Sequence, residues 1–558
     1  MIKKQLKIHS EKLNLLFKKH ICSQILFVIC ATIALMCAVP PVSRDALTHH
    51  LAVPALYVEK GNIHELPEII PSYYPQMLDL LYCIPLIFNN DIVPKYIHFT
   101  FALLTALLIF LYLRQRLNRF YGLLGILFFL SLPVIVKLSV TVYVDLGLIF
   151  FSFAALLSLL KWQEKNFKLS WFFLSAICCG LALSIKYNGL VSLFILTALT
   201  PIIYIKGYQN FFDNNKNKIT TQLKATGFGL AFLLISLTVF SPWMIKNYIW
   251  TDNPVYPLYN SYFNPEPKTE TDLKNKNSRH TMTHFQIRKF IHKESWFETV
   301  SIPLRIFFQG EDDNPKYFDG KLNPLLFLLP LFAFITVPGK QDQFFSHKKL
   351  FLWFSILYIL IVFLKQDMRI RWIGPAIAPL VILSAFGLNN ILLIIKKKFI
   401  KKFFLFLIIC TSCMNAVYIY QLFNKIDPIR YISHQITRDD YIEKFRPEYA
   451  ALQYTNHLKE DIKILAFFLG NRMYYSEHNI KFKYTLFQHL VQNSKTTDNI
   501  AQELKANGFT HFIINFSQFT PWIENSFNLS EKKLIHLFFK THTKILFFKN
   551  GHGVYQCI

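Results

Sequence analysis

Long apolar runs alternate with short basic clusters along most of this chain. Residues 1–20 carry six lysines, and the apolar segment that follows is about 20 residues long, enough to cross a hydrocarbon core of roughly 30 Å. The pattern predicts about eleven membrane-spanning helices. After the first, the predicted spans lie near residues 92–113, 120–138, 142–160, 169–185, 187–205, 225–246, 324–338, 349–365, 372–395 and 403–421.

The basic clusters predict the topology. Lysine and arginine gather on the cytoplasmic side of membrane proteins, and with about eleven spans every cluster falls on one side. This places the N-terminus inside and the C-terminus outside. The first span is interpreted as an uncleaved signal anchor; a cleaved signal peptide is the alternative, disfavoured by the length of the run. The clusters are Arg114, Arg116 and Arg119; Lys161, Lys165 and Lys168; Lys206, Lys216, Lys218 and Lys224; Lys348 and Lys349; and Lys396, Lys397, Lys398, Lys401 and Lys402.

The last part of the chain is mixed polar and apolar and predicts a small α/β domain. We therefore expect a cytoplasmic segment at 1–20, a transmembrane domain at 21–423 with outer loops 42–91 and 247–323, and an extracytoplasmic α/β domain at 424–558. The predicted strands in that domain are 462–468, 481–487, 509–516, 545–548 and 554–557, and the predicted helices are 496–506 and one around 534–539.

Composition supports a polytopic membrane protein. Hydrophobic residues make up 53% of the 558 residues and aromatic residues 16%, which is too apolar for an ordinary soluble protein. The net charge of +26 follows from the positive-inside clusters and needs no nucleic-acid partner. The nine cysteines lie mostly in apolar segments, and their spacing indicates neither a disulfide framework nor a zinc site.

The first outer loop carries the most distinctive motif. Asp45 follows the first span, a helical stretch runs from Leu51 to Gly61, and Tyr73-Tyr74-Pro75 comes after it. This order resembles the GT-C glycosyltransferases, in particular the bacterial aminoarabinose-transferase and protein-mannosyltransferase-like enzymes. The commoner family pattern has Glu after the Asp, whereas Ala46 stands here. The resemblance implies a polytopic helical membrane fold and a sugar donor linked to polyprenyl phosphate.

Two acidic residues are the candidate catalytic groups. Asp45 is the predicted base, because a carboxylate at a partly desolvated surface can have the raised pKa that proton abstraction needs. Asp145, at the outer start of the fourth predicted span, is expected to assist it or to bind a metal, since ionisable residues in membrane spans are functional candidates. The alternative for each is a helix cap.

Three basic residues are expected to hold the donor phosphate. Lys186 stands near the end of Gly180–Tyr187 (GLALSIKY), a segment similar to a Gly-Leu-x-x-x-x-Lys segment of the family. Snorkelling of the lysine to the head groups is the alternative. Arg369 and Arg371, in QDMRIRWIGP, can bind phosphate oxygens in a bidentate way. Two arginines outside run against the positive-inside bias, which argues against simple anchoring.

Weaker candidates complete the predicted site. His49 and His50 could contact phosphate or a metal, but neighbours on a helix point in different directions, so at most one is expected in the site. Tyr73 and Tyr74 could stack on a sugar or lie at the interface. The acidic loop 311–319 (GEDDNPKYFDG from Gly310) could bind a hard cation or be a solvated loop, so the cofactor is left open, with a divalent cation as one candidate.

The sequence therefore predicts a membrane glycosyltransferase that acts on the outer face of a bacterial cytoplasmic membrane, with inversion at the anomeric carbon. Its partners would be a polyprenyl-phosphate-linked sugar, a lipid, glycan or protein acceptor, and the membrane lipids. A polymerase or ligase of lipid-linked oligosaccharides is the alternative within enzymes. A lipid or solute transporter or flippase ranks lower, because the informative charges cluster at span ends rather than deep inside several spans.

Overall fold

The computed structural model describes residues 2–211, 218–265, 283–339, 341–458 and 462–558. Residues 266–282 of the predicted outer loop 247–323, and residues 459–461 of the predicted domain 424–558, lie outside the described residues. The chain forms two compact units. One, here called the helical unit, contains Met1–Cys37, His64–Tyr82 and Val93–Ile426; the other, called the sheet unit, contains Ala38–Ile63, Cys83–Ile92 and Asp427–Ile558.

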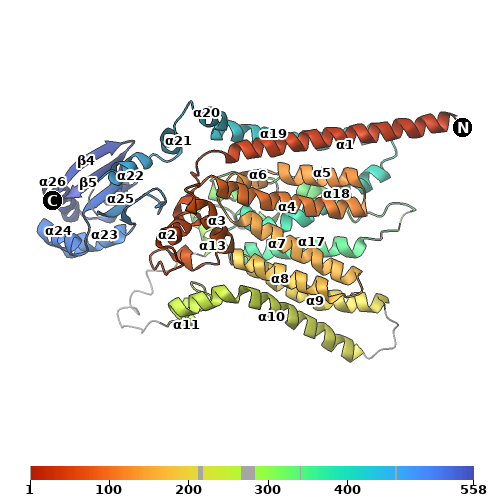
Figure 1. Ribbon diagram of the computed structural model, residues 1–558, viewed down its shortest axis with the longest axis horizontal. Coiled ribbons are helices and arrows are strands. Elements are labelled where there is room, and N and C mark those ends of the chain that lie inside the picture. Colours follow the sequence, from red (N-terminus) through yellow and green to blue (C-terminus); the bar gives the residue numbers. More distant parts are fainter. Residues whose placement is uncertain (1, 212–217, 266–282, 340, 459–461) are drawn as a thin grey trace. The chain divides into compact units, whose positions relative to one another are not determined.

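The helical unit is built from long apolar helices that lie side by side (Figure 1). Short helical turns connect them. The apolar helices, which range from 7 to 36 residues, are α1 (Ile2–Cys37), α4 (Val93–Arg116), α5 (Arg119–Ser131), α6 (Pro133–Ser139), α7 (Asp145–Glu164), α8 (Leu169–Ile185), α9 (Gly189–Phe211), α10 (Lys218–Thr251), α16 (Leu325–Phe332), α17 (Phe345–Lys365), α18 (Gly374–Ile394) and α19 (Lys398–Ile426). The short ones are η2 (Ile70–Tyr73), α11 (Asn260–Phe263), α13 (His284–Gln286), η3 (Ile287–Ile291), α14 (Trp296–Val300), α15 (Ile302–Arg305), η4 (Pro315–Tyr317) and η5 (Ile370–Ile373).

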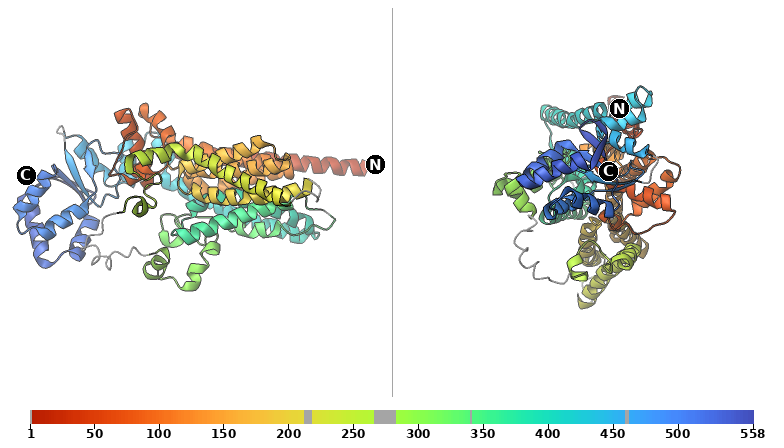
Figure 2. Two further views of the ribbon diagram at one scale, coloured as in Figure 1. Left: turned by 90° about the horizontal axis from the view of Figure 1, so that it is seen from below. Right: turned by 90° about the vertical axis from the view of Figure 1, so that its left-hand side faces the viewer.

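The prediction of a polytopic helical membrane protein is confirmed. Within the described residues, eight helices are long and apolar enough to cross a membrane, and the bent pair α5 and α6, with an angle of 67°, makes nine if it counts as one span. The predicted number of about eleven stays a prediction, since α8 and α16 are shorter apolar helices. Figure 2 shows the same helices side by side in two further views.

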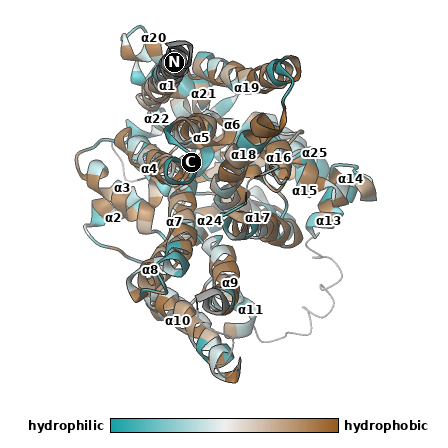
Figure 3. Cartoon of the chain, turned by 90° about the vertical axis from the view of Figure 1, so that its right-hand side faces the viewer, coloured by the Kyte–Doolittle hydropathy of each residue, from teal (hydrophilic) through white to brown (hydrophobic). Residues whose placement is uncertain are grey.

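Burial distinguishes the inner helices from the outer ones. Helices α7 and α18 are the most buried of the candidate spans, and α1, α10 and α19 the least. Seen along the helices, α7 and α18 lie inside the unit while α10 and α19 lie at its edge (Figure 3). At Gly180 of α8 a Cβ atom would lie 2.6 Å from the carbonyl oxygen of Ser236 in α10. Glycine there lets the two helices approach closely, as small residues do in membrane proteins.

The sheet unit combines a five-stranded sheet with helices. The strand order is β2-β1-β3-β5-β4, parallel from β2 to β3 and antiparallel from β3 to β4. The strands are β1 (Lys463–Phe467), β2 (Asn479–Lys481), β3 (His511–Asn515), β4 (Thr543–Lys549) and β5 (His552–Cys557). The helices are η1 (Ala46–His50), α2 (Ala52–Lys60), α20 (Pro428–Ile432), α21 (Arg438–Phe445), α22 (Tyr449–Asn456), α23 (Tyr484–Asn493), α24 (Thr497–Ala506), α25 (Phe516–Ser526) and α26 (Leu529–Thr541), and α3 (Met77–Ile87) contributes to both units.

Both faces of this sheet are covered, and side chains alternate between them with the period of two that strands impose. In β1, Leu465 and Phe467 pack with α23 to α26, whereas Ile464 and Ala466 pack with α22. Both sets are buried. The apolar run of β1 therefore reads as continuous in the sequence because it is covered on two sides.

One predicted strand of this domain is wrong. Residues 481–487 were expected to be a strand, but β2 ends at Lys481 and α23 begins at Tyr484. Phe487, Leu490 and Val491 are buried in α23, and this i, i+3, i+4 spacing favours a helix over a strand. The predicted strands at β1, β3, β4 and β5 and the helices α24 and α26 are confirmed.

Candidate functional site

Asp145 begins α7 at one end of the helical unit, and its carboxylate is buried. The Nζ atom of Lys186 donates a hydrogen bond to Asp145 Oδ1 at 2.9 Å, and the two side chains are 1% (Asp145) and 21% (Lys186) exposed. Val144, not Asp145, occupies the N-cap position, and no side-chain cap hydrogen bond forms there. Asp145 therefore does not cap α7 through its side chain. Instead, the carboxylate is stabilised by a lysine and by its place in the first turn of the helix.

Lys186 stands where α8 ends, in extended backbone with φ −161°. Its predicted role is to hold the donor phosphate, and the structure gives it a second partner in Asp145. The other carboxylate oxygen, Asp145 Oδ2, is buried and has no hydrogen-bond partner among the described residues. Asp145 Oδ2 can therefore still accept a hydrogen bond or bind a cation.

Arg371 supplies a second positive charge to the same cluster. It acts electrostatically on Asp145, and its guanidinium carbon lies 5.0 Å from the centre of the Tyr143 ring. The backbone of Tyr143 is anchored by Tyr82, whose hydroxyl donates to the Tyr143 carbonyl oxygen at 2.5 Å. Asp145, Lys186 and Arg371, named here the Asp145 cluster, thus carry one positive charge in excess. That excess favours an anion such as a phosphate.

Arg369 is held differently from Arg371. Its guanidinium lies 3.6 Å from Asp319 Oδ2 and 5.2 Å from the centre of the Trp372 ring. A backbone bond from Ile370 N to Phe318 O at 2.8 Å ties the same segment to the acidic loop. Arg371 thus acts on Asp145 together with Lys186. Arg369 instead pairs with Asp319 of the acidic loop 311–319, the candidate cation site.

The carboxylates of the acidic loop form ion pairs with basic side chains. Lys137 Nζ lies 3.5 Å from Asp312, 3.2 Å from Asp313 and 3.7 Å from Asp319. Tyr418 also donates to Asp312 Oδ2 at 2.5 Å. Within the described parts of the chain, no group of three or more His, Cys, Asp or Glu side chains could hold a metal ion. Carboxylates already paired with lysine fit a divalent cation poorly, and a metal requirement remains an expectation from the sequence.

Tyr73 and Tyr74 belong to an aromatic cluster of the helical unit. The Tyr73 hydroxyl donates to Glu65 Oε1 at 2.5 Å, and its ring lies 4.7 Å from that of Tyr256. Tyr73 is buried, whereas Tyr74 is 36% exposed and its ring lies 5.8 Å from that of Tyr187. Burial raises the pKa of Tyr74, which keeps its hydroxyl a hydrogen-bond donor. Of the two, Tyr74 is the one that a sugar can reach.

Asp45 and the two histidines lie in the sheet unit. Asp45 is half-buried at the N-cap position of η1, where its side chain makes no cap hydrogen bond. Thr48 donates to the Asp45 backbone oxygen at 3.2 Å. The rings of His49 and His50 in this π-helix have centroids 4.0 Å apart. The expectation that at most one of them lies in the site stays a prediction.

The chain is similar to known membrane proteins in part of its sequence and in its fold. Residues 95–249 match the family model described as dolichyl-phosphate-mannose-protein mannosyltransferase. A structure of ArnT from Cupriavidus metallidurans bound to undecaprenyl phosphate superposes with a TM-score of 0.57 at 11% identity, covering 96% of this chain and 97% of that one. The chain has the fold of ArnT. The apo structure of the same enzyme gives a TM-score of 0.56 at 11% identity, with the same coverage of 96% and 97%.

No curated protein sequence matches the chain. The family match covers α4 to α10, which include Asp145 and Lys186, and the ArnT fold covers both units. The resemblance to GT-C enzymes of the ArnT and protein-mannosyltransferase type is therefore confirmed by the family match and the fold. The predicted class, a multi-pass membrane glycosyltransferase, agrees with both. The roles of individual site residues stay predictions.

Two residues at the site were missed by the sequence analysis. His98 of α4 is fully buried: Leu146 N donates to its Nε2 at 2.9 Å, so Nδ1 carries the proton and faces the Leu138 oxygen at 2.9 Å. This holds the backbone on both sides of Asp145. Lys246 of α10 donates to the Ser72 oxygen at 2.7 Å and so holds the tyrosine turn. Both are ionisable residues inside apolar spans, and that signal could have found them.

Proposed function

We propose that this protein is a membrane glycosyltransferase that moves a sugar from a polyprenyl-phosphate-linked donor to a hydroxyl group of a lipid, glycan or protein. The reaction would take place on the outer face of a bacterial cytoplasmic membrane, with the N-terminus cytoplasmic. The observation that carries the proposal is the Asp145 cluster, in which a buried acid, a lysine and an arginine meet with one positive charge in excess. The fold supports it, since the ArnT structure was solved with undecaprenyl phosphate.

The Asp145 cluster would act on the leaving group. When the bond between the anomeric carbon and the phosphate oxygen breaks, negative charge grows on the phosphate, and cationic side chains stabilise it. Lys186 and Arg371 would stabilise the negative charge on the phosphate. Arg369, two residues before Arg371, would add a further positive charge nearby. Asp145 would hold the lysine in place through the 2.9 Å hydrogen bond. Asp145 would thus orient the lysine. Its negative charge would also neutralise part of the positive charge of the cluster when no donor is bound.

Asp45 would act on the acceptor. Its carboxylate would take the proton of the acceptor hydroxyl as the oxygen attacks the anomeric carbon from the side opposite the phosphate. One displacement inverts the configuration. General-base groups contribute about 10²- to 10⁴-fold to such rates. A divalent cation is not required by these steps, because lysine and arginine can supply the positive charge at the leaving phosphate.

The test is sugar transfer in membranes from cells that express wild type or Asp45→Asn. The pool of polyprenyl-phosphate sugars would be followed by mass spectrometry. We expect wild type to consume donor and Asp45→Asn to leave it intact, with a rate lower by about 10²- to 10⁴-fold. Asp252→Asn is the matched control, because Asp252 is exposed and has φ 53°, which asparagine also adopts.

Two outcomes would count against the proposal. If donor is lost equally with wild type, with Asp45→Asn and without the protein, the chain does not transfer sugar and the transport alternative leads. If wild type consumes donor and Asp45→Asn does so at the same rate, the transferase assignment stands and Asp45 is not the base.

A further inference from the structure

The loop that carries Asp45 folds with the C-terminal part of the chain. Ala38–Ile63 and Asp427–Ile558 belong to the same compact unit, although several hundred residues of sequence separate them. Within this unit the backbone before Asp45 is held by two side chains. Arg446 Nε donates to the Val42 oxygen at 2.6 Å, and the Tyr475 hydroxyl donates to the Pro41 oxygen at 2.8 Å.

The backbone after Asp45 is held by the same segment. The amides of Met473 and Tyr474 both donate to the Leu47 oxygen, at 3.1 and 3.2 Å. Asp45 therefore lies between two anchored stretches, Pro41 with Val42 on one side and Leu47 on the other. Each stretch is bound through backbone carbonyl oxygens, so donors from residues 446–475 help to fix the position of the loop.

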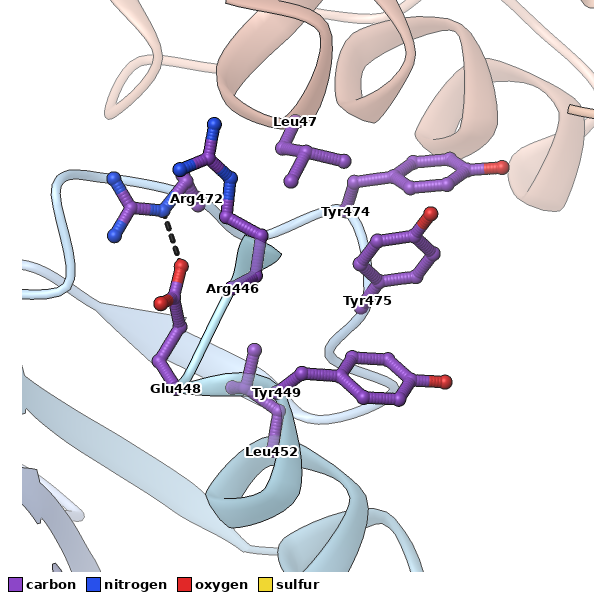
Figure 4. Close-up of a pocket in the computed structure, with 8 residues that line it drawn as sticks. All are labelled: Leu47, Arg446, Glu448, Tyr449, Leu452, Arg472, Tyr474 and Tyr475. Carbon is purple, nitrogen blue, oxygen red and sulfur yellow. Dashed lines mark hydrogen bonds and ion pairs between the residues drawn. The ribbon is translucent and has the colours of Figure 1, made fainter. Parts of the chain in front are cut away.

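The Leu47 side chain fills the space between these donors. It is 2% exposed and lines a cavity of about 10 Å³, which is room for about one water molecule. Figure 4 shows Leu47 facing the arginine and tyrosine side chains of the same unit. A cavity this small cannot take a sugar. The residues around it, which are Leu47, Arg446, Glu448, Tyr449, Leu452, Arg472, Tyr474 and Tyr475, therefore pack the loop instead of binding substrate.

The donors are themselves fixed. Glu448, which is 3% exposed, forms an ion pair with Arg472 (Figure 4), and the Tyr449 ring lies 5.2 Å from that of Tyr475. Burial raises the pKa of Tyr475 far above its usual range, so its hydroxyl remains a donor at any physiological pH. A second ion pair joins Arg438 to Asp91 within the unit. The anchor points of the loop are thus built into a buried polar network.

We propose that Arg446 and Tyr475 are positioning residues of the transfer reaction, which hold the backbone of residues 41–47 and so aim the carboxylate of Asp45. This inference rests on the proposed function, because it takes Asp45 as the base. It gives the C-terminal domain a part in the chemistry. A misplacement of about 1 Å in a reacting group can cost about 10²-fold in rate, which is why two hydrogen bonds to the loop backbone matter.

The experiment compares Arg446→Ala, Arg446→Lys and Tyr475→Phe in the full-length protein. We expect kcat for donor consumption to fall roughly 10- to 100-fold with Arg446→Ala and less with Tyr475→Phe, which loses one hydrogen bond. Arg446→Lys should recover part of the loss, since it keeps a charged donor. KM for donor, and the rise in the unfolding midpoint on adding undecaprenyl phosphate, should stay near wild type. Arg430→Ala is the matched control, as Arg430 is more than half exposed in the same unit.

A double variant tests whether these residues act through Asp45. If they do, Asp45→Asn with Arg446→Ala should be no slower than Asp45→Asn alone, because residues that act as a unit are not additive. Additive losses, or a wild-type kcat in Arg446→Ala and Tyr475→Phe while Asp45→Asn is inactive, would overturn the positioning role alone. A wild type that consumes no donor, or a fully active Asp45→Asn, would instead overturn the proposed function on which it rests.

Discussion

The Asp145 cluster and the Asp45 loop are held by different kinds of interaction. In the helical unit Asp145 is held by side-chain charge: its buried carboxylate bonds to Lys186 at 2.9 Å, with Arg371 as the next cation. In the sheet unit Asp45 is held through the backbone, by donors to the carbonyl oxygens of Val42 and Leu47. The carboxylate of Asp145 is itself bonded to a lysine, whereas the donors that hold the loop bind backbone carbonyl oxygens on either side of Asp45.

This difference matches the two chemical tasks proposed. Charge that develops on a leaving phosphate calls for cations that are already in place, and a buried counter-ion keeps them there. A base must instead gain a proton, and a carboxylate bonded to a lysine would be a weak base because the cation favours its charged form. The comparison predicts that damage to the cluster lowers stability and donor binding together, while damage to the loop lowers the rate and leaves donor binding unchanged.

The largest effect is expected from leaving Asp145 without its cation. Lys186→Met should destabilise the protein by up to roughly 3–5 kcal/mol, because the buried carboxylate loses its hydrogen-bonded cation and keeps only the more distant charge of Arg371. Asp145→Asn combined with Lys186→Met removes both charges and should recover much of the stability. The measurement is the heat-unfolding midpoint in detergent, with Lys365→Met, an exposed lysine of α17, as control. A double variant as unstable as the single one would show that the pair is not what stabilises this end of the unit.

A smaller and more local effect is expected in the sheet unit. Leu47 is buried, so Leu47→Ala should cost roughly 2–5 kcal/mol in the stability of that unit, and Leu47→Met less than about 1.5 kcal/mol. Transfer should slow while donor binding stays. The exposed Leu529, at 72%, provides the Leu→Ala control. If Leu47→Ala weakened donor binding as strongly as transfer, the proposed division of roles between the two regions would be wrong.

The last prediction is a thiol reactivity that reports on the sheet unit alone and leaves transfer unchanged. Burial raises the pKa of Cys557 in β5 to about 12, from 9.0. In a variant with Cys557 as the sole cysteine, alkylation at pH 8 should be about 10³-fold slower than in the unfolded chain, because the thiolate reacts. The raised pKa means that the folded state holds its proton more tightly. Its stabilising contribution is therefore full below pH 9 and is lost as pH rises towards 12.

Iodoacetamide labelling followed by mass spectrometry measures this rate, and it also checks the variants above. Leu47→Ala and Arg446→Ala should leave Cys557 protected if they disturb only the loop. Rapid labelling in either variant would mean that the sheet itself has opened. Rapid labelling in the wild-type background would contradict the burial of this strand end.

The sequence predicted the fold class from the apolar runs and basic clusters, and most strands of the small domain from short apolar runs. It failed at residues 481–487, where Phe487, Leu490 and Val491 form the buried face of α23. Short apolar runs do not separate a strand from a helix by periodicity alone. The sequence also pointed to Asp45, Asp145, Lys186 and the two arginines as candidates, because acids and bases stand at the outer ends of predicted spans, where basic residues run against the positive-inside bias, and because they match the family resemblance.

What the sequence determined by itself is therefore the membrane character, the helices and the list of unusual charges, since each depends on residues that are close together in the chain. Tertiary structure alone decided which charges meet. It pairs Asp145 with Lys186, separates Arg369 from Arg371, and joins the Asp45 loop to Arg446 and Tyr475. These contacts link residues far apart in the chain, and packing of the whole fold, which no local pattern records, brings them within hydrogen-bond distance.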